Sequence, residues 1–275
     1  MSNNQTETKN EQKQANNDPE WASKSLQKRC DCEMCRSGKA TTHNDNSHDQ
    51  SLDQKLSVGG VDIRIVGGTT KCARVTVKFF ETKEFKSTSL KGKKVVEVGS
   101  GTGLVGTCLG LLGAEVTMTD QSYVMEVLQY NIRSIEKKAA KAKKEFRVTT
   151  EEHVWGSEIS NLPACDIVVG SDLIFALEGI RPLVKSIKAL VVKSIKEGRD
   201  PVVYVAVIRR FEWEKLYFEL MDEAFTSETV AKEGDIAIYR YKWKPETNEK
   251  KESKQETSNT NSKNKEGSAD ASSSS

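Results

Sequence analysis

The sequence has few aromatic residues and prolines, and neither sign of charge dominates. Only 7% of its 275 residues are aromatic and 5 are proline, whereas 30% are charged, with a formal net charge of +2 at pH 7. A dedicated nucleic-acid-binding protein normally carries a clear basic excess, so we expect no nucleic-acid partner. The charge balance selects no other kind of partner.

Long apolar runs are also lacking. The sequence has no apolar stretch long enough to span a bilayer, and its first residues lack the basic-then-apolar pattern of a signal peptide. We therefore expect a soluble, cytoplasmic protein without a membrane partner, the nucleus being a second compartment that the sequence allows. In either compartment its 6 cysteines should stay reduced. Cys72, Cys108 and Cys165 lie in apolar or helical surroundings and are expected to be core residues.

Apolar residues concentrate in the middle of the chain. Residues 1–20 and 245–275 consist almost wholly of polar residues, and we expect tails at 1–54 and 245–275 to be disordered. Such segments bury too little apolar surface to offset the entropy cost of ordering. Residues 55–244 hold nearly all the branched aliphatic side chains and match one domain in size. We predict a monomer with one domain between two tails.

Short β-branched runs alternate with stretches of helical periodicity from residue 94 to 241, which predicts a mostly parallel sheet covered by helices. The predicted strands are residues 94–98, 115–119, 146–149, 166–170, 202–208, 228–231 and 235–241. The predicted helices are residues 72–80, 104–112, 123–144, 177–196 and 213–224. No helix separates the last two strands, so they should pair as an antiparallel hairpin at one edge of the sheet.

A glycine-rich loop follows the first strand of this pattern. Gly99, Gly101 and Gly103 alternate just before a predicted helix. Glycines let a backbone turn tightly and approach a ligand, and a helix start offers unpaired N–H groups. The run also continues to Gly106 as a dinucleotide fingerprint, which leaves a nicotinamide-dependent dehydrogenase as one alternative. Asp120, after the second strand, is placed to bind ribose hydroxyls in either kind of site.

Glu97 separates these two kinds of site, because it ends the strand that enters the glycine loop. Its carboxylate would repel a pyrophosphate, but it can accept hydrogen bonds from the ammonium group of a methionine moiety. This favours S-adenosylmethionine over a dinucleotide as the cofactor. The alternative is a plain glycine turn preceded by a surface glutamate.

An ordered set of motifs resembles the seven-strand protein-lysine methyltransferases of methyltransferase family 16, related to the METTL21 group. The matching segments are the glycine loop at 97–104, the strand at 116–120, the Trp-Gly pair at 154–156 and the strand at 166–175. The resemblance implies a Rossmann-like, seven-strand class I methyltransferase fold, α/β, with a C-terminal antiparallel hairpin. It also implies an S-adenosylmethionine-dependent enzyme that methylates a lysine of another protein. Relatives act on chaperones and translation factors, which makes these candidate substrates.

The resemblance assigns most of the cofactor site. It implies that the indole of Trp155 lies beside the adenine and that Ser171 is the small residue where the strand passes the cofactor. The expected cofactor-binding residues are Glu97, Gly99, Ser100, Gly101, Gly103, Asp120, Trp155 and Ser171.

Asp172 is the expected catalytic residue, since it follows a parallel strand at the edge where open α/β sheets hold ligands. The acceptor lysine must be unprotonated, although its pKa is normally near about 10.4. A carboxylate can orient the amine toward the methyl group. The resemblance places Phe175 in the wall of the lysine channel, where its ring attracts the alkyl-ammonium. The alternative for Asp172 is a cap on the next helix.

The sequence departs from the family at one motif. Relatives carry Trp-Asp-Ala-Ala before the first strand, whereas this chain has Thr70-Lys71-Cys72-Ala73. Loss of that indole leaves open a non-catalytic interaction module. A methyltransferase that acts on histidine, arginine or a small molecule is a separate alternative.

Two further groups of residues carry weaker signals. Cys30, Cys32 and Cys35 are poorly spaced for a structural zinc site, and we predict no metal. Arg209 and Arg210 follow the fifth strand at the ligand end of the sheet. One of them could guide a substrate, or both are solvated.

Overall fold

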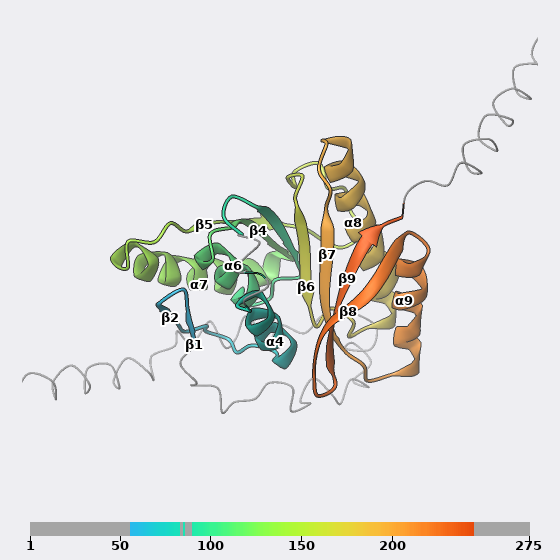
Figure 1. Ribbon diagram of the computed structural model, residues 1–275, viewed down its shortest axis with the longest axis horizontal. Coiled ribbons are helices and arrows are strands. Elements are labelled where there is room, and N and C mark those ends of the chain that lie inside the picture. Colours follow the sequence, from blue (N-terminus) through green and yellow to red (C-terminus); the bar gives the residue numbers. More distant parts are fainter. Residues whose placement is uncertain (1–55, 83–84, 86–89, 245–275) are drawn as a thin grey trace, which may run out of the picture. The chain divides into compact units, whose positions relative to one another are not determined.

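The computed structural model describes residues 56–82, 85 and 90–244 (Figure 1). The predicted tails and the cysteines at positions 30, 32 and 35 lie outside the described residues. The extent of the domain, 55–244, therefore stays a prediction. Within the described part, no helix combines the length and apolar character needed to cross a membrane.

The main element is a seven-stranded sheet in the order β5-β4-β3-β6-β7-β9-β8. Its strands are β3 (Lys94–Val98), β4 (Glu115–Asp120), β5 (Arg147–Glu152), β6 (Ile167–Ser171), β7 (Val202–Ile208), β8 (Phe225–Glu233) and β9 (Ile236–Trp243). Strands β3 to β7 pair in parallel, and β9 runs antiparallel to β7. A two-residue turn at Gly234, whose φ is +57°, joins β8 to β9. The predicted fold class, including the C-terminal hairpin, is confirmed.

Helices cover the sheet in two groups (Figure 1). Their bounds are α4 (Lys71–Phe80), α6 (Leu104–Leu111), α7 (Ser122–Lys141), α8 (Leu177–Lys196) and α9 (Lys215–Asp222), with a short 3₁₀ turn, η1 (Glu212–Glu214), before α9. Helix α6 packs against α4, α7 and strands β3 to β5, while α8 packs against β6 and α9. The predicted helix 123–144 ends early, at Lys141, and Lys143 just beyond it has a φ of +54°.

A small hairpin precedes the sheet and was not predicted. Strands β1 (Leu56–Val58) and β2 (Val61–Ile63) pair antiparallel around Gly59 and Gly60. A Gly-Gly turn between β-branched residues is a hairpin signal, so the sequence did contain the information. Val58 and Val61 are buried, which makes the hairpin part of the core.

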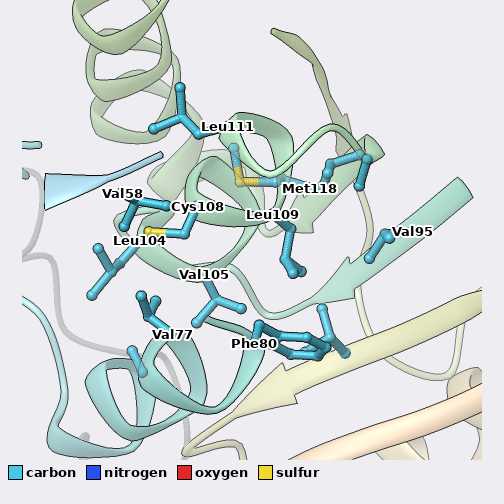
Figure 2. Packing of buried hydrophobic residues seen from close by; sticks show 14 of the residues in the cluster. Val58, Val77, Phe80, Val95, Leu104, Val105, Cys108, Leu109, Leu111 and Met118 are labelled. Carbon is cyan, nitrogen blue, oxygen red and sulfur yellow. The ribbon is translucent and has the colours of Figure 1, made fainter. Parts of the chain in front are cut away.

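The hydrophobic core on the side of the sheet that α6 covers is built around this helix (Figure 2). All eight residues of α6 are buried. Its Val105 and Leu109 belong to one buried cluster with Val77 and Phe80 of α4 and with Met118 of β4. The predicted core cysteines at positions 72, 108 and 165 are buried and free.

The arrangement of the strands creates the place where a site can form. The chain runs outward from β3 to β5 and then returns to β6 on the other side of β3. Ligands of open α/β sheets bind at this reversal, beyond the carboxyl ends of the strands. The residues that follow β3 and β6 therefore meet at one edge of the sheet.

Candidate active site

The glycine loop after β3 is held by hydrogen bonds to β4 and its C-terminal residue. The N–H of Ser100 donates to the carbonyl of Thr119 at 2.9 Å, and the N–H of Gly101 donates to Oδ2 of Asp120 at 2.7 Å. Gly103, the N-cap of α6, has the left-handed conformation, with φ +86°. The loop thus takes a shape that side chains would strain.

Gly99 is closely packed by two side chains from later segments of the chain. Its φ is +66°, and a Cβ atom built on it would lie 2.8 Å from Leu173 Cδ2 and 3.0 Å from Trp155 Cζ2. The predicted adenine-side indole of Trp155 therefore lies directly against the glycine loop. The structure brings these two predicted site residues together from segments more than fifty residues apart in the chain.

Asp120 lies where the sequence places it, at the end of β4. Its Oδ1 accepts a hydrogen bond from the N–H of Gln121 at 2.8 Å, in addition to the bond from Gly101. Burial raises the pKa of this carboxyl, and the two N–H groups partly offset the rise. A carboxylate has about four acceptor positions, so Asp120 keeps capacity for ribose hydroxyls.

Glu97 is more deeply buried than the sequence suggested, with 1% of its surface exposed. Its Oε2 accepts the N–H of Gly106 in the first turn of α6 at 2.9 Å. Burial raises the pKa of Glu97 to about 8, while the Ser100 hydroxyl and the Gly106 N–H act against that rise. The alternative of a surface glutamate is wrong. Contact with a cofactor ammonium stays a prediction.

Two hydrogen bonds at Gly156 hold the turn that contains Trp155. The N–H of Gly156 donates to Ser186 Oγ at 2.8 Å, and Lys185 Nζ donates to the Gly156 carbonyl at 2.7 Å. The imidazole of His153, also within hydrogen-bond distance of Ser186 Oγ at 2.9 Å, is buried, which lowers its pKa. The sequence reasoning missed both His153 and Ser186. A lone buried histidine and a helix serine give no local pattern that could have found them.

Phe175 lies beside this indole. The ring centroids of Trp155 and Phe175 are 5.9 Å apart, with planes tilted by 49°. Phe175 is 47% exposed, so part of its ring is free to contact another molecule. Ser171 is the last residue of β6, opposite Ala206 of β7. Ser171 immediately precedes Asp172, and Phe175 follows it three positions later.

Asp172 has an unusual backbone conformation, with φ +60°. Its N–H donates to the carbonyl of Ala206 at 2.9 Å, and its Oδ1 accepts Nη2 of Arg210 at 2.7 Å. Helix α8 begins after Ala176, so Asp172 does not cap it and that alternative is wrong. Non-glycine residues in this conformation are uncommon and cluster at functional sites.

Thr70, at the position where relatives carry Trp, has a structural role of its own. Thr70 is the N-cap of α4, and its Oγ1 accepts the N–H of Ala73 at 3.1 Å. Threonine is a preferred N-cap residue. Cys72, two positions on, is buried beside Asp172. The described part of the chain contains no group of His, Cys, Asp or Glu that could hold a metal ion.

The residues at this edge fit S-adenosylmethionine. Gly99 provides backbone with no side chain, Asp120 keeps acceptor capacity, and Trp155 supplies an aromatic ring against the loop. A sheet of this strand order with these features at its carboxyl edge defines a class I methyltransferase that uses S-adenosylmethionine as its cofactor. Residues 65–224 match the family described as lysine methyltransferase, and the chain belongs to that family.

Individual relatives agree with this assignment. Over 162 residues the chain is 31% identical to protein N-lysine methyltransferase METTL21A of Danio rerio, a match covering 57% of this chain and 69% of that protein. The METTL21A of Xenopus tropicalis is 30% identical over 160 residues, with the same coverage. EEF1A lysine methyltransferase 3 of Xenopus tropicalis is 25% identical over 207 residues, covering 73% of this chain and 86% of that protein. The resemblance found in the sequence motifs is confirmed, and methyl transfer is favoured over hydride transfer.

Proposed function

We propose that this enzyme transfers the methyl group of S-adenosylmethionine to a lysine side chain of another protein. The observation that carries the proposal is the position of Asp172 in a lysine methyltransferase family member. Asp172 follows β6, at the point where the strand order reverses, and its side chain is 11% exposed. The next residue, Leu173, lies against Gly99 of the glycine loop.

In this proposal Asp172 orients the acceptor. The lysine nitrogen forms a bond to the methyl carbon as the bond from that carbon to sulfur breaks. The amine must be neutral to present its lone pair, and a carboxylate oxygen that accepts one of its N–H bonds fixes the direction of that lone pair. Phe175 contacts the aliphatic part of the lysine with its exposed face. Bound S-adenosylmethionine supplies the electrophilic methyl group.

The remaining residues hold the cofactor in this proposal. Asp120 binds the ribose hydroxyls, and the indole of Trp155 packs beside the adenine. The backbone of the glycine loop and Ser171 pass close to the cofactor. The residues assigned to this role are Glu97, Gly99, Ser100, Gly101, Gly103, Asp120, Trp155 and Ser171.

We further propose that the enzyme is a cytoplasmic monomer whose partner is a protein rather than nucleic acid. The near-neutral charge of the chain argues against a nucleic-acid partner, and the similarity to protein-lysine methyltransferases supports a protein partner. The similarity to EEF1A lysine methyltransferase 3 makes the translation factor EEF1A the first substrate to test. The family resemblance of the sequence motifs makes chaperones a second group of candidates.

Tritium transfer from labelled S-adenosylmethionine to proteins of a cell extract tests the proposal. We expect a labelled protein band with the wild-type chain, label confined to lysine after hydrolysis, and loss of the band with Asp172→Asn. The exposed Asp200, which lies beyond α8, gives the matched control Asp200→Asn, which should retain transfer. Label on histidine or arginine, or no labelled protein despite normal cofactor binding, would reject the lysine assignment.

A further inference from the structure

The partner of Asp172 is Arg210, which follows β7. The two side chains form an ion pair with Nη2 and Oδ1 2.7 Å apart, and they are only 21% and 11% exposed. Solvent screens this pair less than it would a surface pair, so the bond constrains the carboxylate strongly. It also ties the segment after β6 to the segment after β7.

Arg210 is itself held in place. Its backbone N–H donates to Oε2 of Glu214 at 2.9 Å. Glu214 belongs to η1 and is 1% exposed, so it cannot readily move away. The neighbouring Arg209 points elsewhere, because its guanidinium lies 4.2 Å from the centroid of the Phe218 ring. The structure thus resolves the two arginines into one that bonds the acid and one that packs on an aromatic ring.

The conformation of Asp172 requires such a support. A left-handed backbone at a non-glycine residue costs of order 1–3 kcal/mol and persists only where the surroundings fix it. Two hydrogen bonds do so here: the backbone N–H donates to the Ala206 carbonyl, and the carboxylate accepts from the Arg210 guanidinium. The thiol of Cys72 lies against the same carboxylate. Burial, and to a smaller extent the negative charge of Asp172, raise the pKa of this thiol to about 12. Cys72 therefore remains an uncharged neighbour.

We propose that Arg210 is the positioning residue of the reaction, which binds Oδ1 of Asp172 and leaves the other oxygen for the acceptor amine. This inference rests on the proposed role of Asp172.

Kinetics of Arg210→Ala test this role, with Arg209→Ala as the matched control on the adjacent residue. We expect kcat to fall by about 10- to 100-fold in Arg210→Ala, as for a misplaced catalytic group, with unchanged affinity for S-adenosylmethionine. Arg210→Lys keeps the charge and should recover part of kcat. A kcat within twofold of wild type in Arg210→Ala, or an equal loss in Arg209→Ala, would overturn the proposal.

Crystal structures of the wild-type chain and of Arg210→Ala supply a readout that does not depend on activity. We expect the Asp172 carboxylate to leave its wild-type position in the variant, and an unmoved carboxylate would contradict the inference. A wild-type chain that methylates no protein would count against the proposed function alone. Displacement of the carboxylate would still identify Arg210 as the residue that positions it.

Discussion

At the scale of single residues, the candidate site depends on backbone angles that few side chains tolerate. Gly99 and Gly103 have φ values of +66° and +86°, and Asp172 has +60°. The glycines adopt this conformation at little steric cost, whereas Asp172 needs external support. A substitution at Gly99 therefore combines strain with a clash, and both effects act at the predicted cofactor site.

Gly99→Ala should weaken both folding and cofactor binding. The added Cβ would meet Leu173 and Trp155, and the left-handed angle alone costs about 1–2 kcal/mol. We expect the Kd for S-adenosylmethionine, measured by calorimetry, to rise at least about tenfold, which corresponds to about 1.4 kcal/mol. Gly92→Ala is the matched control, because Gly92 has φ +73° but nothing within 4 Å of its Cβ position. Equal Kd values for the two variants would show that Gly99 does not shape the cofactor site.

Local patterns were enough to single out candidate site residues but not their partners. The glycine loop, Asp120 and Asp172 could be located because each lies at the end of a strand that the hydrophobic pattern reveals. The bond from Arg210 to Asp172 could not be predicted, since it spans 38 positions and its neighbour Arg209 has the same local context. The burial of Glu97 was missed for a similar reason, because it depends on how α6 packs over β3.

At the scale of elements, Asn131 links helix α7 to the loops around the site. Its Oδ1 accepts the N–H of Val66 at 2.9 Å, and its Nδ2 donates to the carbonyls of Val66 and Thr102 at 3.0 Å and 2.9 Å. Asn131 is fully buried on the same face of α7 as Leu128 and Ile135. Thr102 belongs to the glycine loop, so this amide connects α7 directly to the predicted cofactor site.

Asn131→Ala should destabilise the fold and loosen the glycine loop. Removing the amide leaves buried backbone groups without partners, which costs about 1–3 kcal/mol for each group. We expect the free energy of unfolding in urea to fall by about 2–4 kcal/mol. Glu126→Ala, an exposed position on the same helix, should change it by less than about 0.5 kcal/mol. Similar values for the two variants would refute the structural role assigned to Asn131.

The types of the helices and strands follow the sequence pattern closely, whereas the residues at which they begin and end do not. The helices 104–112 and 177–196 were predicted almost to the residue because strong periodicity is local. The helix predicted at 213–224 instead begins with the turn η1, where Glu214 bonds back to the Arg210 N–H. The start of this helix depends on a hydrogen bond between one side chain and one backbone N–H, which hydrophobic periodicity does not encode. The β1–β2 hairpin was overlooked because its strands are only three residues long.

At the scale of the whole molecule, the β1–β2 hairpin bears on where the folded unit begins. Val58, Val61 and Ile63 are 0%, 3% and 6% exposed and join the cluster built around α6. Strand β2 also contacts α7, and Lys138 Nζ of α7 donates to the carbonyl of Asp62 at 3.1 Å. The hairpin is therefore a structural part of the methyltransferase core, although it precedes every strand of the main sheet.

A chain shortened to residues 55–244 should bind S-adenosylmethionine as the full-length chain does, because it keeps every described element. A second chain that starts at residue 64 loses three buried aliphatic side chains, each of which stabilises a fold by about 1.5–3 kcal/mol. We expect its free energy of unfolding in urea to be lower by at least about 3 kcal/mol, and its cofactor affinity to fall because α7 and α6 lose a covering layer. The chain of residues 55–244 serves as the control. Equal urea midpoints and equal cofactor affinities for the two shortened chains would place the start of the folded unit after the hairpin instead.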